Sequence, residues 1–218
     1  MQRITRHLLV DEPETSYYVI RASREGPVVL VTAGIHGTEI AGVQAAERLR
    51  NIQLNQGTLI VIPTVNIRAY RRRERGKPDL NRTFPRRSSD KAKHRISRHL
   101  FALARRYQPE WCIDLHEANG FYRLDRSKLG QTLIAYPNQA TVYTAKQVVA
   151  GLNQSITKGT RKFAVKQGKL YGSFRTAAGA VLGCRAITVE TSMQQPRAVR
   201  VQYQVRIVRA LLREIGLI

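Results

Sequence analysis

The chain has 218 residues, of which 43% are hydrophobic and 24% are charged. This composition is ordinary for a folded globular protein and excludes wholesale disorder. No stretch approaches the roughly 20 consecutive apolar residues that a membrane-spanning helix needs. The length suits one sizeable α/β core and is short for two, so we expect a single domain over residues 1–218 and no membrane segment.

The chain is strongly basic. It carries 37 Lys and Arg against 15 Asp and Glu, which gives a formal net charge of +22. Residues 67–106 alone hold 15 basic residues and three acidic ones. Such a field attracts anions, so nucleic acid, an acidic polymer and small carboxylates are all candidate partners. Aromatic residues make up only 7% of the chain and are not interleaved with the basic run, which disfavours a base-stacking surface.

The N-terminal residues MQRITRHLLVDEPETSYY start basic but lack the apolar core and the cleavage site of a secretory signal. We therefore expect a cytoplasmic protein. Cys112 and Cys184 each lie in an apolar, strand-like run. This setting predicts two buried thiols rather than a disulfide.

Apolar runs alternate with helical patterns along the chain, which is typical of an α/β sheet covered by helices. The first half predicts strands at 17–22 and 27–34, a helix at 39–51, a strand at 58–65, a long functional loop at 66–88, and a basic helix that a Ser88-Ser89-Asp90 cap opens and that ends near Tyr107. The second half predicts strands at 110–117 and 131–137, a helix at 141–156, a polar stretch at 158–175, a short helix at 174–182, a strand at 184–192 and an amphipathic helix at 197–215.

Polar residues follow three of the predicted strands. We expect His36 and Glu39 just past the end of the second strand, His116 just past the end of the fourth, and Glu190 just past the end of the sixth. In open α/β sheets, sites form at the carboxyl ends of strands. We therefore expect these distant segments to meet in one crevice.

These residues have the chemistry of a metal centre. His36 and Glu39 lie three residues apart across a glycine-rich turn, so both side chains can reach one ion, and His116 supplies a third ligand. Two His and one Glu leave zinc an open position, which is typical of a catalytic site rather than a structural one. A bound zinc ion lowers the pKa of its water and polarises a carbonyl oxygen. Asp114 is the expected outer partner of His116.

Two further motifs suit hydrolysis next to a carboxylate. Asn81 and Arg82 place an amide beside a guanidinium, which makes a multi-donor receptor for a carboxylate. A buried Glu190 near zinc can take a proton from water and pass it to a leaving nitrogen. Each motif alone is common on ordinary surfaces or strand ends, and only their combination indicates a site.

The ordered series GxHGxE, DLNRxFP, DLHE and TVET, between about residues 27 and 192, resembles the carboxypeptidase A-like zinc metallopeptidases and their relatives, the succinylglutamate desuccinylase/aspartoacylase group. The resemblance implies a mixed, mostly parallel sheet of about eight strands with helices on both faces, and one Zn²⁺ ion. It makes His36, Glu39 and His116 the ligands and Glu190 the general base. It also makes Asn81 and Arg82 the carboxylate clamp.

The same resemblance implies an arginine that stabilises the oxyanion and lies before the DLNR motif. Four arginines are candidates, and spacing favours Arg73; the four are Arg71, Arg72, Arg73 and Arg75. Carboxypeptidases also carry a mobile tyrosine before the base. Tyr171 is the nearest match here, and Arg175 is a second candidate substrate contact.

The expected function is a zinc-dependent hydrolase that cleaves an amide bond next to a carboxylate, in the manner of a metallocarboxypeptidase. The run DLHEANGFYR resembles bacterial metallopeptidases and favours a peptide-like substrate over a small acidic acyl-amino acid. An N-acyl amino acid deacylase is the alternative within the same class. In another class, the alternative is a polyanion- or nucleic-acid-binding protein on an inactive hydrolase fold, with residues 67–106 as the contact.

Overall fold

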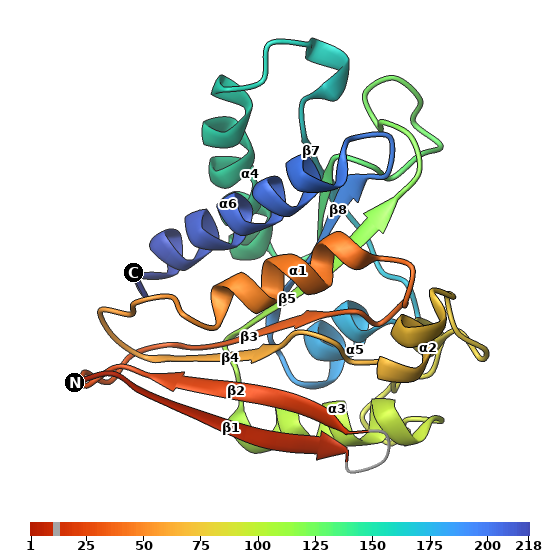
Figure 1. The fold of residues 1–218 in the computed structure, drawn as a ribbon. Coiled ribbons are helices and arrows are strands. Elements are labelled where there is room, and N and C mark those ends of the chain that lie inside the picture. The colour runs from red at the N-terminus through yellow and green to blue at the C-terminus, as the bar shows by residue number, and fades with distance from the viewer. Residues whose placement is uncertain (11–13) are drawn as a thin grey trace.

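The computed structural model describes residues 1–10 and 14–218 (Figure 1). The strands of the described part are β1 (Arg3–Val10), β2 (Thr15–Arg21), β3 (Val28–Ala33), β4 (Thr58–Ile62), β5 (Trp111–Ala118), β6 (Thr132–Ala135), β7 (Ala164–Gln167) and β8 (Arg185–Ser192). Its helices are α1 (Ile40–Leu49), α2 (Ile67–Arg72), α3 (Arg95–Tyr107), α4 (Gln139–Gln154), α5 (Phe174–Val181) and α6 (Arg197–Ile215), with two 3₁₀ turns, η1 (Leu80–Arg82) and η2 (Gly159–Arg161).

The strands form one mixed sheet in the order β1-β2-β4-β3-β5-β8-β6-β7. The four central strands β4, β3, β5 and β8 are mutually parallel, and β7 runs parallel to β6. The pairs β1–β2, β2–β4 and β6–β8 are antiparallel. The expectation of a mixed, mostly parallel sheet of about eight strands is confirmed.

Helices cover both faces of the sheet, as expected. Figure 1 shows α1, α4 and α6 on one face and α3 and α5 on the other. One apolar core lies under each group of helices, and Leu49 and Val208 belong to the first while Leu100 and Phe174 belong to the second. The central strands must therefore be apolar on both faces, which explains the unbroken run VVLVTA in β3.

The topology places the candidate residues. Because β3, β5 and β8 are neighbours and run parallel, their carboxyl ends meet at one edge of the sheet. The turn after β3 and the last residues of β5 and β8 therefore lie close together. His116 and Glu190 lie inside β5 and β8 rather than beyond them, and they are partners in the register of these two strands.

The predicted loop at 66–88 is wrong in part, because it contains α2 and η1. Asn66 starts α2, since its side chain accepts the backbone N–H of Ala69 at 3.2 Å. The predicted start of the next helix is also wrong. Asp90 accepts the backbone N–H groups of Arg86 and Arg87 and so closes a turn, and His94 caps α3 instead.

Two edge strands, β1 and β7, were not predicted from the sequence. β1 shows no clear alternation of polar and apolar residues, because most of its side chains are exposed at the margin of the sheet. β7 has only four residues and lies inside the polar stretch at 158–175. Neither strand has a burial pattern strong enough to be detected from sequence.

Cys112 and Cys184 are buried and unpaired, as expected. Within residues 1–10 and 14–218, no helix has the length and apolar character that crossing a membrane requires.

Candidate metal centre and cleft

The turn between β3 and α1 delivers His36 and Glu39. Gly34 adopts φ +65°, a conformation that favours glycine. At Gly37 the turn lies so close to α2 that a Cβ atom would stand 2.0 Å from the carbonyl carbon of Ala69. The two glycines therefore let a tight turn pack against α2 and point both side chains inward.

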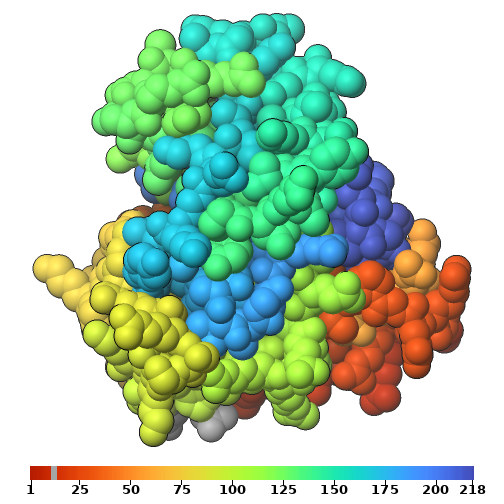
Figure 2. All heavy atoms as spheres, turned by 180° about the vertical axis from the view of Figure 1, so that it is seen from behind, coloured from red at the N-terminus to blue at the C-terminus, as the bar shows by residue number. Residues whose placement is uncertain are grey.

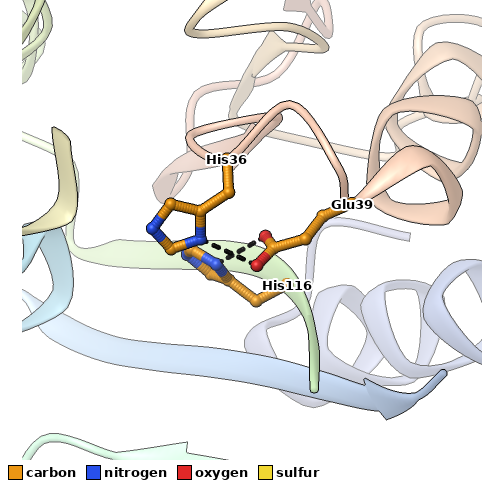
Figure 3. Close-up of side chains that lie close together, drawn as sticks. All are labelled: His36, Glu39 and His116. Atoms are coloured by element: carbon orange, nitrogen blue, oxygen red, sulfur yellow. Dashed lines mark hydrogen bonds and ion pairs between the residues drawn. The ribbon is translucent and has the colours of Figure 1, made fainter. Parts of the chain in front are cut away.

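His36, Glu39 and His116 meet in the interior of the protein (Figure 3). His36 Nδ1 lies 2.7 Å from Glu39 Oε1, and His116 Nδ1 lies 2.7 Å from Glu39 Oε2. None of the three residues is more than 3% exposed. One ligand atom from each residue lies within 4.8 Å of the others, which is a spacing that suits one metal ion.

Each histidine turns its second ring nitrogen to another carboxylate. His116 Nε2 lies 2.7 Å from Asp114 Oδ2, and the hydroxyl of Thr32 donates to the other oxygen of Asp114 at 2.7 Å. His36 Nε2 lies 3.0 Å from Asp79 Oδ1. We assign a proton to each Nε2 atom, since these carboxylates can only accept. The lone pairs on both Nδ1 atoms then face Glu39, which is the usual arrangement of metal-binding histidines with outer carboxylates.

This assignment brings three electron-pair donors together in a buried space, and a positive charge must lie among them. A proton supplies it in the metal-free protein. Burial alone would lower the pKa of His116, but Asp114 and Glu39 raise it well above its usual value. Burial alone would raise the pKa of Glu39, but His116 and His36 lower it to about 2. The donor set therefore fits a divalent cation, which would replace that proton.

Glu190 lies beside this group on β8. Its Oε2 atom is buried and has no hydrogen-bond partner among the described residues. Burial is the main reason that the pKa of Glu190 rises to about 8; His116 opposes the rise. The carboxylates of Glu39 and Asp114 add to it. A carboxyl group in this setting can hold or release a proton near neutral pH.

The group formed by His36, Glu39 and His116 lies at a cleft of about 280 Å³. Figure 2 shows the surface hollowed between the green lobe, which includes the loop after β5, and the yellow segment, which includes η1. Residues from both of these segments line the cleft. The lining includes seven residues that the sequence predicted as candidates for the site: His36, Glu39, Arg75, Asn81, Arg82, His116 and Glu190.

Asn81 and Arg82 lie in η1 at one wall of the cleft. Asn81 is buried, and its Oδ1 atom accepts the backbone N–H of Phe174 at 2.9 Å. Its amide nitrogen is then the group that can donate to a ligand. Arg82 is exposed, and its Nη1 atom donates to the backbone carbonyl of Asn81 at 2.7 Å. The pair therefore presents N–H groups at the wall of the cleft.

Arg75, rather than Arg73, reaches the cleft among the described residues. Arg75 Nε and Nη2 donate to Asp79 Oδ2 at 3.1 and 2.9 Å, and the other oxygen of Asp79 faces His36. Arg73 ends α2 at φ 55°, and its guanidinium carbon lies 4.3 Å from the ring centroid of Tyr70. The geometry therefore favours Arg75 for the role that spacing gave to Arg73.

Tyr171 and Arg175 do not line the cleft in the part of the chain that the structure describes. Tyr171 is 58% exposed, and its neighbour Leu170 reaches the lining instead. Arg175 is buried and donates to the backbone carbonyls of Gly168 at 2.9 Å and Ala135 at 3.3 Å. Burial lowers the pKa of Arg175 to about 10. Here Arg175 ties a loop to β6, and the substrate roles of both residues stay predictions.

Helix α6 braces the strand that carries His116. Gln204 is fully buried and donates to the backbone carbonyl of His116 at 3.0 Å. Arg200 pairs with Glu117, whose other oxygen accepts the N–H of Ala41 at 2.8 Å. Arg200 and Gln204 were not predicted as part of the site, because polar positions in an amphipathic helix normally face solvent.

The fold and the site together define a class: a mixed α/β sheet with a buried His-Glu-His group, compatible with a metal ion, in a cleft at the carboxyl ends of its central strands. Residues 25–196 match the family model of the succinylglutamate desuccinylase/aspartoacylase catalytic domain. The chain belongs to this family. A search of curated proteins gave no match.

Solved structures share the fold at low identity. The product-bound cell shape determinant Csd4 from Helicobacter pylori is 18% identical, with a TM-score of 0.79 over 100% of this chain and 56% of Csd4. A candidate metallopeptidase from Shewanella amazonensis SB2B is 18% identical, with a TM-score of 0.78 over 98% of this chain and 87% of that protein. The chain thus spans just over half the length of the Csd4 structures that it matches.

Proposed function

We propose that this protein is a zinc-dependent hydrolase that cleaves an amide bond next to a carboxylate. One observation carries the proposal: the Nδ1 atoms of His36 and His116 both lie 2.7 Å from the Glu39 carboxylate, while their outer nitrogens face Asp79 and Asp114. Such an array of buried acceptors is held ready for a cation. Nitrogen and carboxylate ligands in this number suit zinc.

His36, Glu39 and His116 would hold the ion, which when bound polarises a carbonyl oxygen and makes water more acidic. Glu190 stands beside them as the group that accepts a proton from the attacking water and donates it to the departing amine. Its Oε2 atom is buried and has no hydrogen-bond partner among the described residues, which leaves this carboxylate free to take up that proton. Arg75 lines the same cleft, and we propose that it binds the oxygen of the scissile carbonyl as negative charge develops there.

The substrate end of the cleft selects for a negative group. Asn81 and Arg82 present N–H donors at the wall, and we propose that they bind the carboxylate of the substrate. The enzyme would then choose the bond that lies a fixed distance from that carboxylate.

A peptide-like substrate is the leading proposal within this class. It is supported by the structural neighbours, since Csd4 is described as a D,L-carboxypeptidase and has been solved with a tripeptide and with mDAP. The alternative is deacylation of N-acyl amino acids, which the family model favours. Both reactions use the same groups and differ in what fills the cleft beyond the scissile bond.

The test is metal content combined with a substrate screen. We expect the purified protein to bind one equivalent of zinc by elemental analysis, and His116→Ala to lose most of it. The zinc form should release amino acids from peptides with a free carboxyl end, or acids from N-acyl amino acids, and a chelator should abolish either activity. Glu190→Gln should keep the metal and lose turnover about 10²–10⁴-fold. Full turnover in this variant would contradict the mechanism.

A further inference from the structure

A second cavity is lined by Glu74 and by residues 76–78, which flank Arg75 in the sequence. Its volume is about 260 Å³, and its walls come from α2, from residues 76–78 and from the start of α3. The floor is well packed, because Ala69, Leu80 and Ile96 are each at most 5% exposed. These apolar contacts hold three separate segments of the chain in fixed positions around the cavity.

The walls of this cavity are cationic. They carry four permanently charged groups, Arg68, Arg72, Lys77 and Arg95, against the single carboxylate of Glu74. Glu74 lies 3.8 Å from Arg72, and both side chains are at least half exposed, so this pair neutralises little. Arg68 and Lys77 have no ion-pair partner in the part of the chain that the structure describes. Bringing such charges together costs free energy, which a bound anion would recover.

Neutral donors at the same cavity complete a receptor for oxygen atoms. Asn66 uses its Oδ1 atom to cap α2, which leaves its amide nitrogen for a ligand. The absence of a side chain at Gly76 keeps this nitrogen open, since a Cβ there would stand 3.1 Å from it. His94 accepts the N–H of Ile96 with Nδ1 at 3.2 Å, so its Nε2 atom carries the proton and can donate.

The positive charges around the cavity affect the pKa of His94 in its wall. Burial first, and then the guanidinium groups of Arg98 and Arg95, lower the pKa of His94. A histidine in this state stays neutral at pH 7 and contributes a donor rather than a charge. The cavity therefore combines fixed cations with uncharged N–H groups, which is the chemistry that recognises phosphate oxygens.

We propose that this cavity is a binding site for a phosphate group, which arrives either as free phosphate or as part of a phosphodiester chain. Arg68 and Lys77, which have no ion-pair partner among the described residues, together suit an anion that carries more than one charge better than they suit one carboxylate. Most of the cavity lining also belongs to the basic stretch 67–106, which contains 15 Lys and Arg but only three acidic residues. A longer phosphate polymer could therefore make further contacts with this stretch. The site is distinct from the catalytic cleft, although the two share the loop at 73–79.

The experiment compares two double variants that remove the same charges from different places. Arg68→Gln with Lys77→Gln alters the cavity, and Arg209→Gln with Lys146→Gln alters exposed residues on α6 and α4. The probes are inorganic phosphate, measured by calorimetry, and a fluorescein-labelled single-stranded 12-mer DNA, measured by anisotropy at several salt concentrations. Poly-L-glutamate serves as a carboxylate polymer. Zinc content and the thermal midpoint check that both variants are folded.

The cavity variant should bind phosphate at least tenfold more weakly than the parent, and the control variant should change by less than twofold. If the DNA shows the same loss and its salt dependence falls by about two counterions, the phosphodiester chain is the source of the phosphate. If only phosphate is affected, the free anion is the ligand. Equal losses in both variants, tighter binding of poly-L-glutamate than of either phosphate probe, or no binding of phosphate or DNA would each overturn the proposal.

Discussion

Replacing Glu190 by glutamine should stabilise the metal-free protein at alkaline pH. The pKa of Glu190 is about 8 in the folded chain, against a usual value of 4.5. Its folded-state pKa is raised, so the folded protein holds a proton that the unfolded chain has lost between these two pH values. Wild-type stability therefore falls as pH rises through this window, and the full cost is present above about pH 8. The shift of about 3.5 pH units corresponds to an upper limit of about 5 kcal/mol.

Glutamine cannot ionise, so the variant avoids this cost. The assay is urea unfolding of both proteins in the presence of a chelator, at pH 4.5 and at pH 8.5. The difference in the free energy of unfolding between variant and wild type should favour the variant by several kcal/mol more at pH 8.5 than at pH 4.5. Any fixed penalty from an unpaired amide cancels in this comparison. An equal difference at the two pH values would refute the idea of a buried carboxylate without a partner.

Four further predictions concern the metal and the cleft. Metal affinity should weaken as pH falls below neutrality, because the raised pKa of His116 means that a proton competes for its Nδ1 atom; titration with zinc from pH 6 to pH 8 measures this, and a flat profile would contradict it. Arg82→Ala should raise KM at least tenfold for substrates with a free carboxylate and leave kcat within a fewfold of wild type, measured on one substrate and its amide. Arg75→Ala should lower kcat about 10²-fold while its matched control Arg73→Ala should not, and the reverse result would restore the choice made from spacing. Gln204→Leu should weaken zinc binding about tenfold through loss of the bond to the His116 carbonyl, with the thermal midpoint measured in parallel, whereas unchanged zinc affinity would show that this bond has no role in positioning the ligand.

The central strands and covering helices could be predicted because burial on both faces leaves long apolar runs in the sequence. The predicted strands at 27–34 and 184–192 correspond to β3 and β8, and no predicted end differs from the observed end by more than one residue. The edge strands could not be predicted in this way. Most side chains of β1, for example, are exposed, so its sequence shows no regular apolar pattern. The start of α3 was misplaced because Asp90 serves a local turn, and short polar side chains cap turns and helices alike.

Local motifs predicted the three residues that could hold a metal ion, whereas the residues that contact them from other segments could not be predicted. His36, Glu39 and His116 follow from spacing and strand ends, and they meet in the structure. Asp79 belongs to the same DLNR motif as Asn81, but its contact with His36 was not predicted. Its Oδ1 atom lies 3.0 Å from His36 Nε2. Its partner Arg75 was one of four candidates, and only the path of the chain after α2 shows which of them reaches the cleft.

Helix α6 has a consequence for how this protein can be shortened. Recognisable similarity to the family ends at residue 196, one position before the helix begins. Nevertheless Val208 and Leu212 of α6 complete the apolar layer over the sheet, and Gln204 supports the backbone behind His116. A fragment that ends at residue 196 would expose the apolar surface under α6 and would also remove the hydrogen bond from Gln204 to the backbone of His116. The stretch that the family model matches is thus shorter than the unit that the packing completes, and laboratory truncations should keep α6.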